Sequence, residues 1–160
     1  MAAPLSHVVV LANCRSGLGT GPEARSRDIA AAFAGTSLRP RIQCVAGDRL
    51  GRAAHHAGRD GAELVGAAGG DGTVSAVAGA VAGTGVPMGV LPLGTLNHFA
   101  RDAGIPLGLA QAAQAVVNGT CTRVDVAEVN GRVFVNNSSI GVYPHAVETR
   151  DRIMPEGGAK

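Results

Sequence analysis

The chain has 160 residues, of which 46% are hydrophobic and only 2% aromatic, and its formal net charge is +2 at pH 7. That length corresponds to one ordinary domain, or to one domain and part of another. The absence of Trp, together with one Tyr and three Phe, leaves few rings on which bases could stack, so we expect no nucleic-acid partner.

The cysteines and the apolar runs restrict the cellular setting. Cys14, Cys44 and Cys121 are far apart and form no CxxC pair, which argues against a disulfide framework or a zinc knuckle. No apolar run approaches the roughly 20 residues that span a bilayer, and the first residues lack the charged and apolar blocks of a signal peptide. These features predict a cytoplasmic protein whose contact with the inner face of a membrane is peripheral.

The first part of the chain predicts short strands that alternate with helices. A β-branched run indicates a strand at 7–12, a loose alternation indicates a second over 39–45, and further strands are expected at 62–68 and 88–91. Helical spacing of apolar residues indicates helices from Pro22 to before Gly35, from a capping Asp48 to about residue 57, from 74 to before Gly83, and over 97–103. Repeated strand–helix units favour an α/β fold with a doubly wound parallel sheet.

The pattern changes after this part. A helix over 109–117 precedes two extended segments, 122–129 and 132–136, which flank Asn130-Gly131, a strong signal for a β-hairpin. We therefore expect an α/β domain over 1–119 and the beginning of a second, strand-rich domain over 120–160, which the chain enters without completing. Unpaired strand edges on such a hairpin would favour a homodimer.

The segment Gly69-Gly70-Asp71-Gly72-Thr73 lies between a predicted strand and a predicted helix. Glycines at this place let backbone N–H groups approach a phosphate at the positive end of the helix. Asp71 would repel a nucleotide unless it held Mg²⁺ or a donor group. The alternative is a tight turn in which Asp71 caps the following helix. The spacing fits neither a Walker A loop nor GxGxxG.

A second loop, over 91–99, also follows a strand and precedes a helix. Its Thr95 and Asn97 can hydrogen-bond to phosphate or ribose, although either could equally be a plain N-cap. Asn13 and Ser16 follow the first predicted strand. Because parallel strands present their carboxyl ends to one side, the three loops should converge on one cleft.

The order of these segments resembles the diacylglycerol kinase catalytic-domain family, which includes sphingosine kinases and bacterial lipid kinases. The resemblance covers roughly 7–128 and implies binding of ATP and Mg²⁺ and transfer of the γ-phosphoryl group to the hydroxyl of diacylglycerol or a related membrane lipid. It implies a catalytic and magnesium-binding role for Asp71, and a lipid-binding role for the segment after 119. The positions assigned to the nucleotide are Asn13, Ser16, Gly69, Gly70, Gly72, Thr73, Gly94, Thr95 and Asn97.

The chain departs from the family pattern at several positions. Ser75 and Ala76 stand where the family commonly has Asn-Glu, and His98 stands where an Asp often follows the asparagine of the second loop. The family's catalytic carboxylate comes from a later Asp-Gly-Glu-like motif, which does not follow residue 130, where the remaining acids are Glu148, Asp151 and Glu156. The alternatives are an NAD kinase-like enzyme, whose family shares the GGDG loop, and a non-catalytic nucleotide-binding module or fragment.

Overall fold

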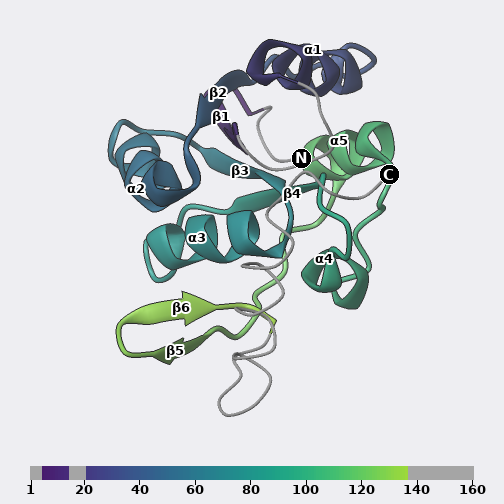
Figure 1. Cartoon of the computed structure of the whole chain (residues 1–160). Helices are drawn as coiled ribbons and strands as arrows, with labels where there is room; N and C mark the ends of the chain where they lie inside the picture. Colours follow the sequence, from purple (N-terminus) through teal and green to yellow (C-terminus); the bar gives the residue numbers. More distant parts are fainter. Residues whose placement is uncertain (1–4, 15–20, 137–160) are drawn as a thin grey trace.

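The computed structural model describes residues 5–14 and 21–136, and its centre is a parallel sheet (Figure 1). The sheet has four strands in the order β2-β1-β3-β4. The strands are β1 (Val8–Asn13), β2 (Arg41–Val45), β3 (Leu64–Gly69) and β4 (Met88–Pro92). In the register of the two central strands, Val8 lies opposite Leu64 and Ala12 opposite Ala68.

Helices cover both faces of the sheet, which confirms the predicted doubly wound α/β fold (Figure 1). The helices α1 (Pro22–Phe33) and α5 (Leu109–Asn118) pack on one face, and α2 (Leu50–Arg59) and α3 (Asp71–Val81) on the other. Strand β1 serves both layers, because Val8 and Val10 contact the α1–α5 side while Val9 and Leu11 contact the α2–α3 side. An uninterrupted apolar run is what a strand buried on both faces requires.

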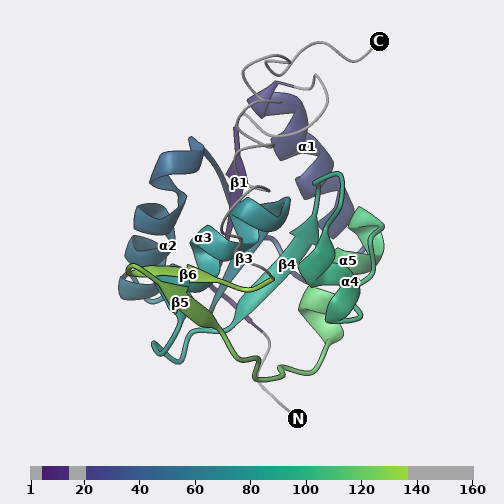
Figure 2. The same ribbon diagram turned by 60° about the horizontal axis from the view of Figure 1, so that its bottom comes forward.

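The predicted hairpin is present, with shorter strands than the sequence indicates. It consists of β5 (Ala127–Val129) and β6 (Arg132–Phe134), which pair antiparallel. Asn130 and Gly131 have φ angles of 50° and 74°, as a two-residue type I′ turn requires. Figure 2 shows the hairpin lying across α3, where a Cβ added at Gly79 would lie 3.2 Å from the Cβ of Val133.

The prediction for Asp48 is wrong. Residues Gly47–Arg49 form a 3₁₀ turn, and α2 then begins with Arg49 at its N-cap position and no side-chain cap. Asp48 therefore lies inside the turn and not at the helix boundary. The short helix predicted over 97–103 is α4 (His98–Asp102).

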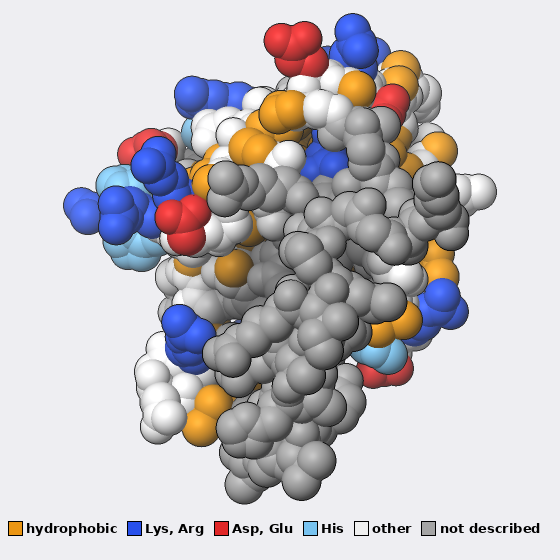
Figure 3. All heavy atoms as spheres, in the orientation of Figure 1, with side chains coloured by type: hydrophobic (Ala, Val, Ile, Leu, Met, Phe, Trp, Pro, Cys, Tyr) orange, Lys and Arg blue, Asp and Glu red, His pale blue; other side chains and the backbone are white. Residues whose placement is uncertain are grey.

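Charged and histidine side chains gather over α2 (Figure 3). His55 and His56 are both exposed. Within residues 5–14 and 21–136, no helix combines the length and the apolar character needed to cross a membrane.

Candidate functional site

The carboxyl ends of the strands meet at one edge of the sheet. Strand β1 ends at Asn13, β3 at Gly69 and β4 at Pro92. From β1 the chain moves outward to β2, and it then returns to place β3 on the other side of β1. In open α/β sheets the crevice outside the strand ends at such a reversal is the usual ligand site.

A hollow of about 190 Å³ opens at this point, between the ends of β1 and β2 and the start of α3. Its lining residues are Asn13, Gly47, Leu50, Gly70, Gly72 and Thr73. Four of these belong to the predicted nucleotide site, and the structure brings them together from two different loops.

Sequence reasoning did not identify Gly47 and Leu50 as residues of the site. Gly47 follows β2 by two residues, and Leu50 is the first residue of α2. A Cβ at Gly47 would lie 3.4 Å from the Nδ2 atom of Asn13. The available signal is a glycine just beyond a predicted strand, at the same edge of the sheet as the other glycine loops.

The glycines of the first loop, residues 69–73, differ in whether packing within the chain requires them. At Gly69 an added Cβ would lie 2.3 Å from the Oγ1 atom of the buried Thr73, so packing within the chain requires glycine there. At Gly72 an added Cβ would meet nothing within 4 Å, and φ is outside the left-handed region. Neither packing nor backbone conformation explains the glycine at 72, which leaves bare backbone at the wall of the hollow.

The N-terminus of α3 borders the same hollow. The helix begins at Asp71, and Gly70 and Gly72 both line the hollow. The N–H groups of Thr73 and Val74 donate to the carbonyl oxygen of Gly70. The first amides of a helix lack intrahelical acceptors and carry partial positive charge, which makes this wall suitable for an anion.

In the second loop, the turn over residues 93–97 is held together by two hydrogen bonds to the side chain of Asn97. Asn97 has a left-handed φ of 51° and is 9% exposed. Its Nδ2 donates to the carbonyl of Gly94 at 2.7 Å, and its Oδ1 accepts from the N–H of Gly94 at 3.0 Å. Asn97 occupies the N-cap position of α4 without making a side-chain cap, so it braces the loop that precedes the helix.

Gly94 and Thr95 lie outside the lining of the hollow. Gly94 packs against the first loop, because an added Cβ would lie 2.4 Å from the Cα of Gly70. Thr95 is exposed. The structure thus brings the second loop against the first loop, on the side away from Asn13.

Asp71 joins the two loops. Its Oδ2 accepts from the N–H of His98 at 3.1 Å and its Oδ1 accepts from the N–H of Phe99 at 3.0 Å. The alternative interpretation placed Asp71 as a cap of the helix that follows it, α3. The hydrogen bonds instead run to the first amides of α4, while the His98 side chain is exposed.

The end of β1 carries a buried cation and a thiol. Arg25 of α1 is 6% exposed and its Nη1 donates to the carbonyl of Asn13. Burial, and secondly the neighbouring Cys44, raises the pKa of the Cys14 thiol above its ordinary value. Cys14 is therefore protonated at neutral pH and adds no negative charge beside the hollow.

Some predicted features lie outside the described residues, namely Ser16 and the acids Glu148, Asp151 and Glu156. In the part of the chain that the structure describes, no three His, Cys, Asp or Glu side chains gather closely enough to hold a metal ion. Asp71 lies between two of the lining glycines, Gly70 and Gly72. A magnesium ion is commonly held by one or two carboxylates together with substrate phosphates, and a single Asp71 fits that arrangement.

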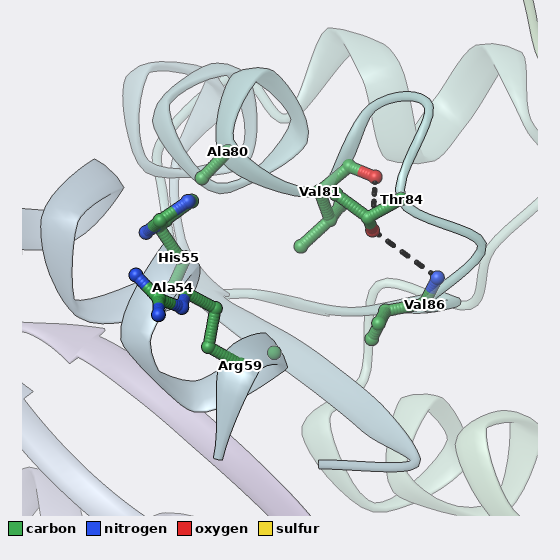
Figure 4. Close-up of a pocket in the computed structure, with 8 residues that line it drawn as sticks. Ala54, His55, Arg59, Ala80, Val81, Thr84 and Val86 are labelled. Carbon is green, nitrogen blue, oxygen red and sulfur yellow. Dashed lines mark hydrogen bonds between the residues drawn. The ribbon is translucent and has the colours of Figure 1, made fainter. Parts of the chain in front are cut away.

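A second hollow, of about 150 Å³, lies between α2 and α3 (Figure 4). His55 and Arg59 line it from α2, and Val81, Thr84 and Val86 line it from the end of α3 and the turn that follows. The Thr84 hydroxyl donates to the carbonyl of Val81 and accepts from the N–H of Val86. This hollow lies toward the amino edge of the sheet and contains no predicted site residue.

Comparison with known proteins gives consistent similarities. Residues 7–129 match the family described as the diacylglycerol kinase catalytic domain. A probable YegS-like lipid kinase of Pseudomonas aeruginosa is 41% identical over 128 residues, which are 76% of this chain and 42% of that protein. A diacylglycerol kinase of Bacillus subtilis is 41% identical over 90 residues, which are 52% of this chain and 30% of that protein.

Solved structures show the same similarity. A putative diacylglycerol kinase from Bacillus anthracis str. Sterne superposes with a TM-score of 0.70 and 26% sequence identity, over 84% of this chain and 46% of that one. The chain thus spans less than half the length of each of these relatives.

Proposed function

Because the chain belongs to the diacylglycerol kinase catalytic-domain family, we propose that it is the nucleotide-binding part of an ATP-dependent lipid kinase. In this proposal the enzyme transfers the γ-phosphoryl group of ATP to the hydroxyl of diacylglycerol or a related membrane lipid. The observation that carries the proposal is the hollow at the strand-order reversal, with Gly72 as a wall that no internal contact explains.

The phosphates of ATP would occupy this hollow. Gly70 and Gly72 expose backbone at the N-terminus of α3, and Asn13 and Thr73 add short polar side chains to the lining. Phosphoryl transfer requires little covalent chemistry from the protein and depends on positioning and on stabilising negative charge. A wall of backbone amides at a helix N-terminus supplies both.

Magnesium would be held beside the phosphates by Asp71. The ion neutralises charge on the phosphoryl oxygens when bound. Both carboxylate oxygens of Asp71 accept one N–H each, and every carboxylate oxygen has further lone-pair capacity. The second loop, with Gly94, Thr95 and Asn97, supports the first loop and extends the nucleotide site beyond the hollow.

The lipid acceptor would meet the nucleotide at a second domain. We propose that 1–119 form the nucleotide-binding domain and that 120–160 belong to the lipid-binding domain, which acts on the cytoplasmic face of a membrane. The relatives extend well beyond the matched segment, and we place the general base in that extension. We therefore expect the 160-residue chain to bind nucleotide without phosphorylating lipid, and to dimerise through the exposed strand β5 of its hairpin.

Nucleotide protection tests the proposal. Mg·ATP should raise the melting temperature of the 160-residue chain more than NAD does at equal concentration, since a ligand stabilises the native state that binds it. Gly72→Val should abolish this protection, because a β-branched side chain would fill the hollow. The control is Gly35→Val, at a surface glycine where an added Cβ also meets nothing within 4 Å.

Each outcome has a distinct meaning. Protection by Mg·ATP in Gly35→Val but not in a folded Gly72→Val protein supports the site. Equal protection in both variants would remove the hollow from the nucleotide site. Stronger protection by NAD would favour the NAD kinase-like alternative.

A further inference from the structure

Asp71 belongs to the first loop by sequence but to the second loop by its hydrogen bonds. It is the first residue of α3 and lies between Gly70 and Gly72, which both line the hollow. Yet its two carboxylate oxygens accept the N–H groups of His98 and Phe99, which are 27 and 28 residues away. The carboxylate therefore spans from the wall of the hollow to the start of α4.

The loops make two further contacts at this junction. The N–H of Leu93 donates to the carbonyl of Gly69 at 3.0 Å. The backbones of Gly70 and Gly94 approach so closely that a Cβ on Gly94 would lie 2.4 Å from the Cα of Gly70. Such an approach requires the two loops to keep one relative position, since a shift would separate the donors from their acceptors.

The second loop is held at both ends of its turn. Asn97 has a left-handed backbone, which asparagine tolerates better than most residues. Its side chain braces Gly94 from within the loop. Asp71 holds the residues that immediately follow, His98 and Phe99, so Asn97 lies between two fixed points.

The same hydrogen bonds explain how a carboxylate is tolerated beside a phosphate site. The negative charge of Asp71 is shared with two amides of α4 and lies in the first turn of α3. An anion in the first turn of a helix is stabilised by the helix dipole. Part of its repulsion toward a nucleotide is thereby offset within the protein.

We propose that Asp71 is a positioning residue, whose carboxylate latches the loop 93–97 and the start of α4 to the glycine loop 69–72 and so holds the phosphate-facing hollow in its binding shape. The inference rests on the proposed function, because the effect on ligand affinity presupposes that the hollow binds ATP. It goes further because Asp71 would hold the two loops together before any ligand binds, and without a metal ion.

Amide exchange in the ligand-free protein tests the latch directly. Exchange rates of individual amides can be measured by NMR on the 160-residue chain and on Asp71→Asn and Asp71→Ala. Ala removes both acceptors, whereas Asn keeps one acceptor oxygen in nearly the same shape. The matched control is Asp102→Asn, which removes an exposed carboxylate at the other end of α4.

The latch predicts a graded result. The amides of His98 and Phe99 should exchange about tenfold faster or more in Asp71→Ala, and to an intermediate degree in Asp71→Asn, because a charge-assisted hydrogen bond to a backbone amide is lost. The amide of Val65, bonded to Pro87 at the start of β3, should not change. Unchanged exchange at His98 and Phe99 in a folded Asp71→Ala protein would overturn the latch.

Calorimetry with ATP separates positioning from metal binding. With Mg²⁺ present both roles predict weaker binding. In EDTA a latch still predicts about tenfold weaker binding to Asp71→Ala than to wild type, with Asp71→Asn in between. A residue that serves only the metal predicts binding in EDTA that is unchanged or tighter, since a negative charge near the phosphates has been removed, and that result would overturn the positioning role.

The two proposals fail in different ways. If the wild-type chain binds no ATP, the proposed function fails, while the exchange rates at His98 and Phe99 still decide whether Asp71 holds the loops together. If ATP binds and the exchange rates do not respond to Asp71, the function stands and the positioning role falls.

Discussion

The two edges of the central sheet both use glycine, but for different physical reasons. At the amino edge, Gly61 precedes β3 and Gly83 precedes β4, with φ angles of 84° and 72° and open space around an added Cβ. At the carboxyl edge, Gly70 and Gly94 have no left-handed φ, but an added Cβ on either would press on the other's backbone. The amino edge needs glycine for its backbone angles, and the carboxyl edge needs it for room.

This difference shows which glycines belong to a turn and which to a site. A glycine with positive φ in open space is explained by the turn alone. A glycine with ordinary φ is required for room only where a neighbour comes close, as at Gly94, whereas at Gly72 we propose that the neighbour is the bound nucleotide. Substitutions at the two edges should therefore differ in how much stability they cost and in the physical reason for that cost.

The largest effect should come from Gly94→Ala. Its Cβ would lie 2.4 Å from the Cα of Gly70 and 2.8 Å from the Oδ1 of Asn97, and neither the backbone nor the braced asparagine can move freely. We expect a loss of about 3 kcal/mol in the free energy of unfolding, at the upper end of overpacking costs. Urea denaturation measures it, with Gly72→Ala as a control that should stay within about 0.5 kcal/mol of a neutral surface change.

A loss below about 1 kcal/mol for Gly94→Ala would mean that the two loops separate easily. Gly94 would then need no more room than Gly72, and the carboxyl edge would not require glycine for close packing.

A smaller effect is expected at the amino edge from Gly83→Ala. The space is open, so only the left-handed backbone opposes the change, at a cost of about 1–2 kcal/mol. Gly83→Asn should cost less, because asparagine tolerates this conformation better than alanine. Equal losses for Ala and Asn in urea denaturation would show that the backbone angle is not what the turn requires.

The smallest effect concerns Glu63, which ties the amino edge to the segment before β1. The backbone N–H groups of His7 and Ser6 donate to its Oε2 and lower the pKa of its carboxyl group. A lowered folded pKa means that this stabilisation is present above the unfolded pKa of about 4.3 and is lost as the pH falls through the folded value.

Melting temperatures of wild type and Glu63→Gln between about pH 3 and 6 check this effect. Wild type should be the more stable near pH 6, and the difference should shrink toward zero in acid. Because Glu63 is exposed, the shift should be small. A difference that grows as the pH falls would contradict the assignment.

Most of the fold follows from local signals in the sequence. The apolar run Val8–Ala12 predicts a strand that is buried on both faces, as β1 is, and the Asn130-Gly131 turn carries its own conformational preference. The strand ends also follow, so the sequence predicts that Asn13, Gly70 and Thr73 share an edge. The exact strand lengths of the hairpin and the 3₁₀ turn at Asp48 do not follow, because element boundaries depend on neighbouring packing.

The order of strands and helices, and the edge at which the glycine loops gather, can be predicted from the amino-acid sequence, since they depend on residues close together in the chain. The folded structure is needed to show that Gly47 and Leu50 complete the hollow and that Asp71 bonds to α4 and not to its own helix. Periodicity and turn chemistry act over a few residues, whereas the partner of Asp71 is 27 residues away. Which loop reaches that carboxylate is set by the order of strands in the sheet and by the absence of side chains at Gly70 and Gly94, which lets the two backbones meet.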